Sequence, residues 1–167
     1  MELFDVVDEL DRVVEQRPRG EVHAARLRHR AVHVFLVRGD GRMLIHLRTP
    51  TKEEFPSVWT SSASGHVSAG ETYDESAARE LTEELGIVAP LERLKKFDAC
   101  PDTSMEFTVL YSAASDEPIS ADETEIAAID WLETGEISRR IRDRPALFSP
   151  AFRLLFEWFD TVNRNST

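Results

Sequence analysis

Cysteine is nearly absent from this chain. Its 167 residues include one, Cys100, so no internal disulfide can form, and we expect Cys100 to be a small buried residue rather than a nucleophile. Long hydrophobic runs are also missing, and none approaches the ~20 residues that a membrane-spanning helix needs. No signal peptide is evident. We therefore expect a cytoplasmic protein with no membrane partner.

Positively charged residues are also few relative to negatively charged ones. The chain has 20 Lys and Arg residues against 31 Asp and Glu residues, which gives a net charge of −11. This balance argues against a nucleic-acid partner held by a basic surface. Hydrophobic residues make up 41% and charged residues 31% of the chain, as is typical of a globular protein rather than a disordered one. We expect residues 1 to 167 to form a single domain.

The pattern of apolar and turn-forming residues predicts strands and helices along the whole chain. Residues 31 to 37 are apolar almost throughout, which is typical of a strand covered on both faces. The other expected elements are a hairpin at about 4 to 16, a short turn or helix at 17 to 28, strands at 43 to 48, 93 to 99, 105 to 113 and 125 to 132, a loop at 49 to 64, and helices at 134 to 142 and about 149 to 163. Mixed strands with helices before and after them predict an α/β layered domain.

Residues 65 to 87, GHVSAGETYDESAARELTEELGI, hold the most informative pattern. Thr72 followed by Glu75 is a capping-box pair, so a helix should begin near Tyr73. Gly86 is suited to end that helix. The face that should pack on the core consists of Ala77, Leu81 and Leu85.

Three carboxylates crowd an adjoining stripe of the same helix. Glu80, Glu83 and Glu84 are spaced i, i+3, i+4, and like charges at that spacing destabilise an isolated helix. A hard divalent cation bound by oxygen ligands, Mg²⁺ or Mn²⁺, would remove the conflict. Glu71 can add a fourth carboxylate, and Arg79 is placed to brace either Glu83 or the glutamate of the capping pair. We expect the stripe to be exposed.

The pattern resembles the Nudix box, the signature of hydrolases that cleave a diphosphate linked to another group. Its nine fixed positions are filled by Gly65, Glu71, Arg79, Glu80, Leu81, Glu83, Glu84, Gly86 and Ile87. The resemblance implies a Nudix fold, which is an α/β/α sandwich around a mixed β-sheet. It also implies a small-molecule diphosphate substrate and a Mg²⁺ or Mn²⁺ cofactor.

The resemblance also assigns roles to individual residues. The metal ligands would be Glu80, Glu83 and Glu84, with Glu71 and the Gly65 carbonyl assisting. Arg79 would orient the carboxylates. The general base varies among such enzymes, so Glu83 is the first candidate and Glu123 or Glu125 are alternatives.

Flanking segments from about residue 21 to 159 resemble the isopentenyl-diphosphate-isomerase-like branch of this superfamily. The matching segments are LRHRAVHVFL at 27 to 36, FPSVWTSSASGH at 55 to 66, DETEIAAIDW at 122 to 131 and FSPAF at 148 to 152. The isomerase itself uses a cysteine directly before the Gly-His pair, where this chain has Ser64. Its later glutamate matches Glu106, but the partner position is Ser104.

The sequence leaves open whether a second metal site exists and which reaction the protein catalyses. The isomerase binds a second metal, and His29, His66 and Glu106 match part of that set, whereas His23 is offset by one residue. The intact glutamates of the box favour hydrolysis over isomerisation and over a third alternative, a regulator that binds nucleotides without catalysis. The substrate-binding residues are unassigned, and the oligomeric state is open, a homodimer included.

Overall fold

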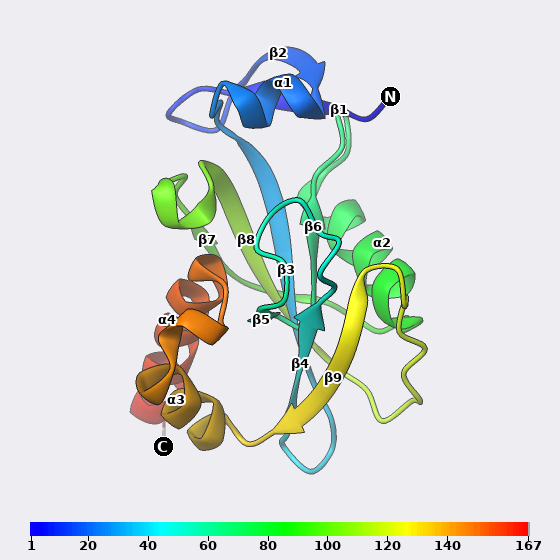
Figure 1. The fold of residues 1–167 in the computed structure, drawn as a ribbon, viewed down its shortest axis with the longest axis vertical. Helices are drawn as coiled ribbons and strands as arrows, with labels where there is room; N and C mark the ends of the chain where they lie inside the picture. Colours follow the sequence, from blue (N-terminus) through cyan, green and yellow to red (C-terminus); the bar gives the residue numbers. More distant parts are fainter. Residues whose placement is uncertain (167) are drawn as a thin grey trace.

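The computed structural model describes residues 1–166, and Figure 1 shows their arrangement. The strands are β1 Leu3–Val7, β2 Val13–Pro18, β3 His29–Val37, β4 Met43–Arg48, β5 Trp59–Thr60, β6 Ala63–His66, β7 Glu92–Phe97, β8 Glu106–Ala114 and β9 Ile126–Leu132. The helices are α1 Arg19–Ala24, α2 Tyr73–Leu85, α3 Thr134–Asp143 and α4 Pro150–Asn165. Most of the expected elements therefore lie close to their predicted positions.

The central sheet is mixed. Its strand order is β5-β4-β3-β8-β7, with β6 also paired to β3 and β9 to β4. The long strands β3 and β8 run parallel, and the other pairs are antiparallel. A parallel strand buried on both faces is expected to be apolar throughout. This explains why the run at 31 to 37 lacks a polar face.

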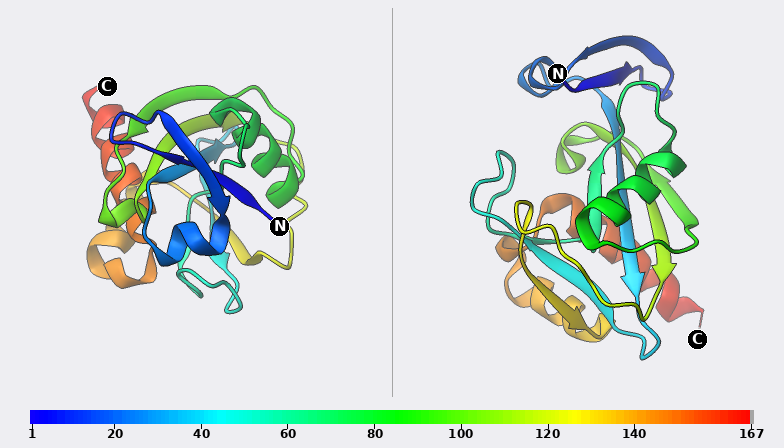
Figure 2. Two further views of the ribbon diagram at one scale, coloured as in Figure 1. Left: turned by 90° about the horizontal axis from the view of Figure 1, so that it is seen from above. Right: turned by 90° about the vertical axis from the view of Figure 1, so that its right-hand side faces the viewer.

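Helices cover both faces of this sheet, as Figures 1 and 2 show. One apolar core joins α2 to one face of β3, through side chains such as Leu81, Val32 and Val34. The other core joins α3 and α4 to the opposite face, through side chains such as Phe35 and Phe152. Because successive side chains of a strand point to opposite faces, β3 contributes to both cores. The fold is the Nudix fold, an α/β/α sandwich.

The N-terminal hairpin is fixed to the end of the sandwich by a buried charge. β1 and β2 pair antiparallel, and Asp11 lies in the turn between them with a φ of 61°. Its carboxylate accepts hydrogen bonds from Arg30 Nε at 2.7 Å and Tyr73 Oη at 2.7 Å, and it pairs with Lys96. Since these three partners come from β3, α2 and β7, one side chain ties the hairpin to the central sheet and to α2.

Two expectations about local structure were wrong. Residues 49 to 64 are not a continuous loop, because they contain β5 and the start of β6, which pair with β4 and β3. β5 has only two residues, and the four residues of β6 are mostly serine, alanine and glycine, so neither segment shows the β-branched alternation that marks a strand. Cys100 is half-buried rather than buried. No helix within residues 1–166 is long and apolar enough to cross a membrane, as expected.

Candidate active site

The helix that carries the glutamates begins and ends as its sequence predicts. Thr72 accepts a hydrogen bond from the backbone N–H of Glu75, and the Glu75 carboxylate accepts one from the backbone N–H of Thr72 at 2.9 Å. Gly86 follows the last turn in the left-handed conformation, with a φ of 67°. These caps confirm the prediction and fix where α2 starts, which sets the direction of each glutamate on it.

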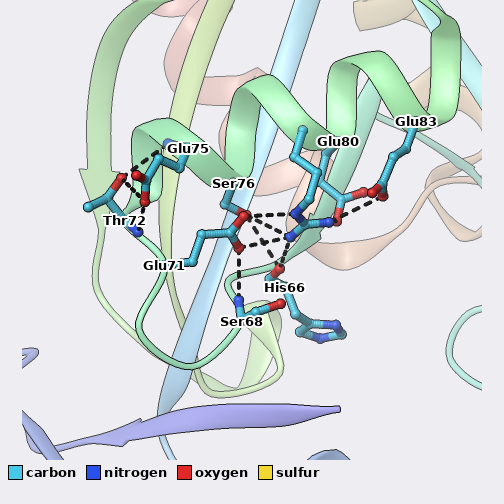
Figure 3. A network of polar contacts seen from close by, with 9 residues as sticks. His66, Ser68, Glu71, Thr72, Glu75, Ser76, Glu80 and Glu83 are labelled. Carbon is cyan, nitrogen blue, oxygen red and sulfur yellow. Dashed lines mark hydrogen bonds and ion pairs between the residues drawn. The ribbon is translucent and has the colours of Figure 1, made fainter. Parts of the chain in front are cut away.

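The Arg79 guanidinium lies among three of the carboxylates and binds each of them. Its guanidinium donates to Glu71 Oε1 at 2.8 Å, to Glu80 Oε1 at 2.8 Å and to Glu83 Oε2 at 3.2 Å. Figure 3 shows the side chains of Glu71, Glu80 and Glu83 converging along one side of α2, near the backbone oxygen of His66. Glu71 and Glu80 raise the pKa of Arg79, which therefore stays charged. The capping glutamate takes no part in this network.

Glu84 lies inside the protein and not on an exposed stripe, contrary to expectation. Its side chain points toward β6, where it accepts a hydrogen bond from the backbone N–H of Ser64 at 2.8 Å. Burial and the neighbouring Glu80 raise the pKa of Glu84 well above its usual value. Glu83 keeps 59% of its side-chain surface exposed, whereas Glu80 keeps 13%. The close packing of α2 on β6, which the sequence does not encode locally, buries two of the three glutamates.

Gly65 allows this close packing. A Cβ atom added at Gly65 would overlap the Glu80 carboxylate, so any larger residue would displace it. Burial raises the pKa of Glu80 to about 7, and the charge of Glu83 acts in the same direction although Arg79 opposes it. A raised carboxyl pKa in a cleft means that the negative charge of the group is unfavourable there, and a bound cation would stabilise that charge.

The raised pKa of Glu80 should appear in the pH dependence of unfolding without metal. A carboxyl group with a pKa of about 7 when folded and a usual value of 4.5 binds its proton more tightly in the folded chain. Its contribution to stability is therefore present below about pH 4.5 and is lost as the pH rises through about 7. We expect the difference in Tm, parent minus Glu80→Gln, to decrease as the pH is raised from about 5 to about 8 in the presence of chelator. A difference that stays constant across this range would contradict the assignment.

The glutamates open onto a cavity of about 330 Å³. It lies between β3, β6 and α2 on one side and the loop after β4, the loop before β9 and the start of α4 on the other. Its charged lining residues are Glu2, Arg19, Arg48, Lys52, Glu54, Arg79, Glu80, Glu83, Glu84, Glu106, Asp122 and Glu125. The volume lies near the lower end of the range for small-molecule sites, about 300–1,000 Å³.

The structure separates the two alternative bases. Glu125 lines the cavity, where its carboxylate pairs with Lys52 from the loop after β4. Glu123 is exposed and does not line the cavity. The geometry therefore keeps Glu83 and Glu125 as candidates and removes Glu123, because a base must reach the reacting water.

The predicted second set of ligands also comes together. His66 Nε2 lies 3.0 Å and His29 Nε2 lies 3.4 Å from the same carboxylate oxygen of Glu106. The two histidines lower the pKa of Glu106 far below its usual value, although burial opposes them. His23 joins them, with its ring centroid 5.3 Å from that of His29 and 5.0 Å from that of His66. The offset of one residue in the sequence had set His23 apart, but α1 brings it to the cluster.

Sequence reasoning missed several side chains at the cavity. Lys52 and Glu54 come from the segment expected to be an irregular loop, and Arg48 holds that loop by donating to the Glu54 backbone oxygen at 2.9 Å. His33, on the strand expected to be wholly apolar, also lines the cavity. The single polar residue within that apolar run was the signal that could have identified it.

An α/β/α sandwich that presents a carboxylate-rich helix at a cavity defines a class of protein, the hydrolases of diphosphate compounds. Comparison with known families agrees with this assignment. The model of the NUDIX domain matches residues 27–152, so the chain belongs to the Nudix family. Members of this family typically use a divalent metal ion, and the chain is a Nudix hydrolase that acts on diphosphate compounds.

Relatives of known sequence and structure support this placement. The chain is 35% identical to the Nudix hydrolase YfcD of Escherichia coli K12, over 83% of this chain and 78% of YfcD. It is 32% identical to a prenyl-diphosphate phosphatase of Methanosarcina mazei, over 90% of this chain and 91% of that protein. The crystal structure of DR0079 from Deinococcus radiodurans superposes with a TM-score of 0.76 at 31% identity, over 85% of this chain and 90% of DR0079.

Proposed function

We propose that this chain is a Mg²⁺-dependent hydrolase that cleaves the diphosphate linkage of a nucleoside diphosphate joined to another moiety, or of a related organic pyrophosphate. Mn²⁺ would serve as an alternative ion. The observation that carries the proposal is the convergence of Glu80, Glu83 and Glu84 at the Gly65 end of the cavity. Three carboxylates at one wall of a cavity of this size suit a metal–diphosphate complex.

The residues present fit a hard divalent cation. All of the donors are carboxylate or carbonyl oxygens, which Mg²⁺ and Mn²⁺ prefer. The pKa values of Glu80 and Glu84 are raised by burial and by neighbouring carboxylates, Glu83 acting on Glu80 and Glu80 acting on Glu84, and a bound cation would relieve both effects. Glu80, Glu83 and Glu84 would hold the ion, with Glu71 and the Gly65 carbonyl assisting. Such an ion supplies an acidified water and charge neutralisation on the phosphates.

Side chains of the protein would position the carboxylates and take the proton of the attacking water. Arg79 fixes the positions of Glu71, Glu80 and Glu83, so the carboxylates are held before any ligand arrives. Glu83 is exposed, and its only polar side-chain partner among residues 1–166 is Arg79, which suits the residue that takes the proton of the attacking water. Glu125 is the alternative base, but its pairing with Lys52 would have to break first.

We propose a second cation site at the histidine cluster. The nitrogens of His23, His29 and His66 lie within 4.8 Å of one another, and the ligand atoms of Glu54, His66 and Glu106 do so as well. His23 Nε2 is buried without a hydrogen-bond partner among residues 1–166, and His29 Nε2 has the Glu106 carboxylate at 3.4 Å without a well-formed hydrogen bond. Buried polar atoms without partners are costly, so a metal ion at this point would satisfy both.

The proposed function is tested by incubating a panel of nucleoside diphosphate derivatives and prenyl diphosphates with the protein in Mg²⁺ and separating the products by chromatography. Hydrolysis of a nucleoside diphosphate derivative gives a nucleoside monophosphate and the phosphorylated moiety, whereas hydrolysis of a prenyl diphosphate releases inorganic phosphate. We expect turnover of at least one compound, complete loss in excess chelator, and recovery on adding Mg²⁺ or Mn²⁺. Full activity in excess chelator would exclude the metal-dependent reaction. Binding of a nucleotide without turnover of any compound would favour a regulatory role instead.

A prenyl diphosphate is the second candidate substrate. The prenyl-diphosphate phosphatase of Methanosarcina mazei is similar to this chain along nearly its whole length. That likeness makes removal of phosphate from a prenyl diphosphate the competing activity. The panel above contains both classes, so the ratio of their kcat/KM values decides between them.

Isomerisation of a prenyl diphosphate is not expected. Ser64 stands where the isomerase has its acid–base cysteine, and its backbone N–H is bonded to Glu84. A thiol titrates near pH 8.5, whereas an alcohol stays protonated and is a poor acid toward carbon. We expect no solvent deuterium in isopentenyl diphosphate after incubation with the protein, as followed by NMR. Ser64→Cys should not restore exchange, because Ser104, just before β8, stands at the partner position of the isomerase glutamate. Rapid exchange by the parent would make the isomerase the correct assignment.

A further inference from the structure

One buried histidine at the cavity has no role in the chemistry described so far. His33 lies in the middle of β3 and is 6% exposed, and its ring lines the cavity. Its Nδ1 is 2.6 Å from the hydroxyl oxygen of Ser61, which is itself fully buried. Its other ring nitrogen, Nε2, has no hydrogen-bond partner among residues 1–166.

The contact with Ser61 selects the tautomer of His33. Within the described part of the chain, the Ser61 side chain has no hydrogen-bond partner other than His33 Nδ1. If Nδ1 carried the proton, the buried Ser61 hydroxyl would have no acceptor, which is unfavourable. Ser61 therefore donates to Nδ1, and Nε2 carries the ring proton. Burial lowers the pKa of His33 to about 4, so the ring is neutral at physiological pH and Nε2–H is a fixed donor.

The surroundings of His33 are polar. The charges of Glu106 and Arg48, which line the same cavity, act on its ring. Thr60 and Ser149 also line the cavity, and their hydroxyl oxygens lie 3.0 Å apart. The apolar side chains at the cavity are either small, as at Ala31 and Ala151, or partly exposed, as Phe55 is at 40%. An apolar chain in this space would leave the His33 N–H buried without a partner, which is unfavourable.

We propose that His33 is a specificity-determining residue whose Nε2–H donates a hydrogen bond to a polar group of the substrate. This inference rests on the proposed function and restricts the class of substrate. The moiety next to the cleaved diphosphate would carry oxygen acceptors, as a sugar or nucleoside does, and would not be a prenyl chain. Ser61 acts through His33 as a positioning residue.

The first test measures substrate discrimination. In the parent, kcat/KM for UDP-glucose or ADP-ribose should exceed that for dimethylallyl diphosphate. His33→Leu should lower this ratio by about 10–100-fold, because the polar substrate loses its donor and the apolar one does not. His33→Gln, which keeps an N–H donor, should recover part of the ratio. The matched control is His46→Leu, since His46 is equally buried on β4 but bonds to the Ser62 backbone oxygen and does not line the cavity. Equal losses for both substrate classes in His33→Leu would overturn the inference.

The second test does not need turnover. Long-range ¹H–¹⁵N spectra of the histidine rings should show His33 as the Nε2–H tautomer in the parent, and as a mixture of tautomers in Ser61→Ala. With Mg²⁺ present, UDP-glucose or ADP-ribose should shift the His33 Nε2 signal, and dimethylallyl diphosphate should leave it in place. A Nδ1–H tautomer, or no shift with either polar ligand, would exclude this role for His33. If the ring responds to ligand but no compound of the panel is hydrolysed, the proposed function fails and the binding inference stands.

Discussion

Replacing Glu83 with glutamine is expected to lower kcat by about 10²–10⁴-fold on a verified substrate, the scale for losing a positioned base, with weaker metal binding adding to the loss. Because Glu83 is exposed and contacts only Arg79, the free energy of unfolding should change little. The measurement is steady-state kinetics beside thermal unfolding. Glu92→Gln, on the exposed edge strand β7, is the control and should match the parent.

Glu84→Gln should cause a loss of activity in the same range, but for a different reason. The amide oxygen can still accept the hydrogen bond from the Ser64 backbone N–H, so the packing of α2 on β6 should persist. Without metal the variant should be at least as stable as the parent, because a buried carboxyl with a raised pKa has been neutralised. If either variant keeps turnover within a few-fold of the parent, the metal and base assignments are wrong.

The second large effect is expected at Asp11, far from the glutamates. Asp11→Asn leaves the charges of Arg30 and Lys96 at a site where the carboxylate is 5% exposed. Removing one partner of a buried ion pair typically costs about 3–5 kcal/mol, and we expect about 3 kcal/mol because Lys96 retains contact with water. Asparagine tolerates the positive φ of this position, so backbone strain does not contribute.

The measurement for Asp11 is denaturant unfolding of the parent and the variant. Glu9→Gln, an exposed position in the same turn, is the matched control and should lie within about 0.5 kcal/mol of the parent. A cost below about 1 kcal/mol for Asp11→Asn would show that the ion pairs of Asp11 do not hold the hairpin. The apolar contacts of Phe4, Val6 and Val22 and the backbone hydrogen bond from Val7 to Arg28 would then hold it.

The sequence determined the local features that depend on neighbours along the chain. The capping pair Thr72 and Glu75, together with Gly86, predicted both ends of α2, because helix termini need partners for their free backbone groups. The apolar run at 31 to 37 predicted a strand buried on both faces. The spacing of the glutamates predicted a carboxylate cluster on one side of a helix, because residues three and four apart lie together there.

The tertiary structure alone decided which of these groups are buried and what they face. Glu84 is buried and Glu83 is exposed, although both belong to one stripe, because α2 packs on β6 at Gly65. Helices and strands distant in sequence place His23 beside His66 and Lys52 beside Glu125. Periodicity reports the face of an element but not the partner it meets, since that depends on long-range packing. The contact of His33 with Ser61 arises in this way, since the two residues lie 28 positions apart in the sequence.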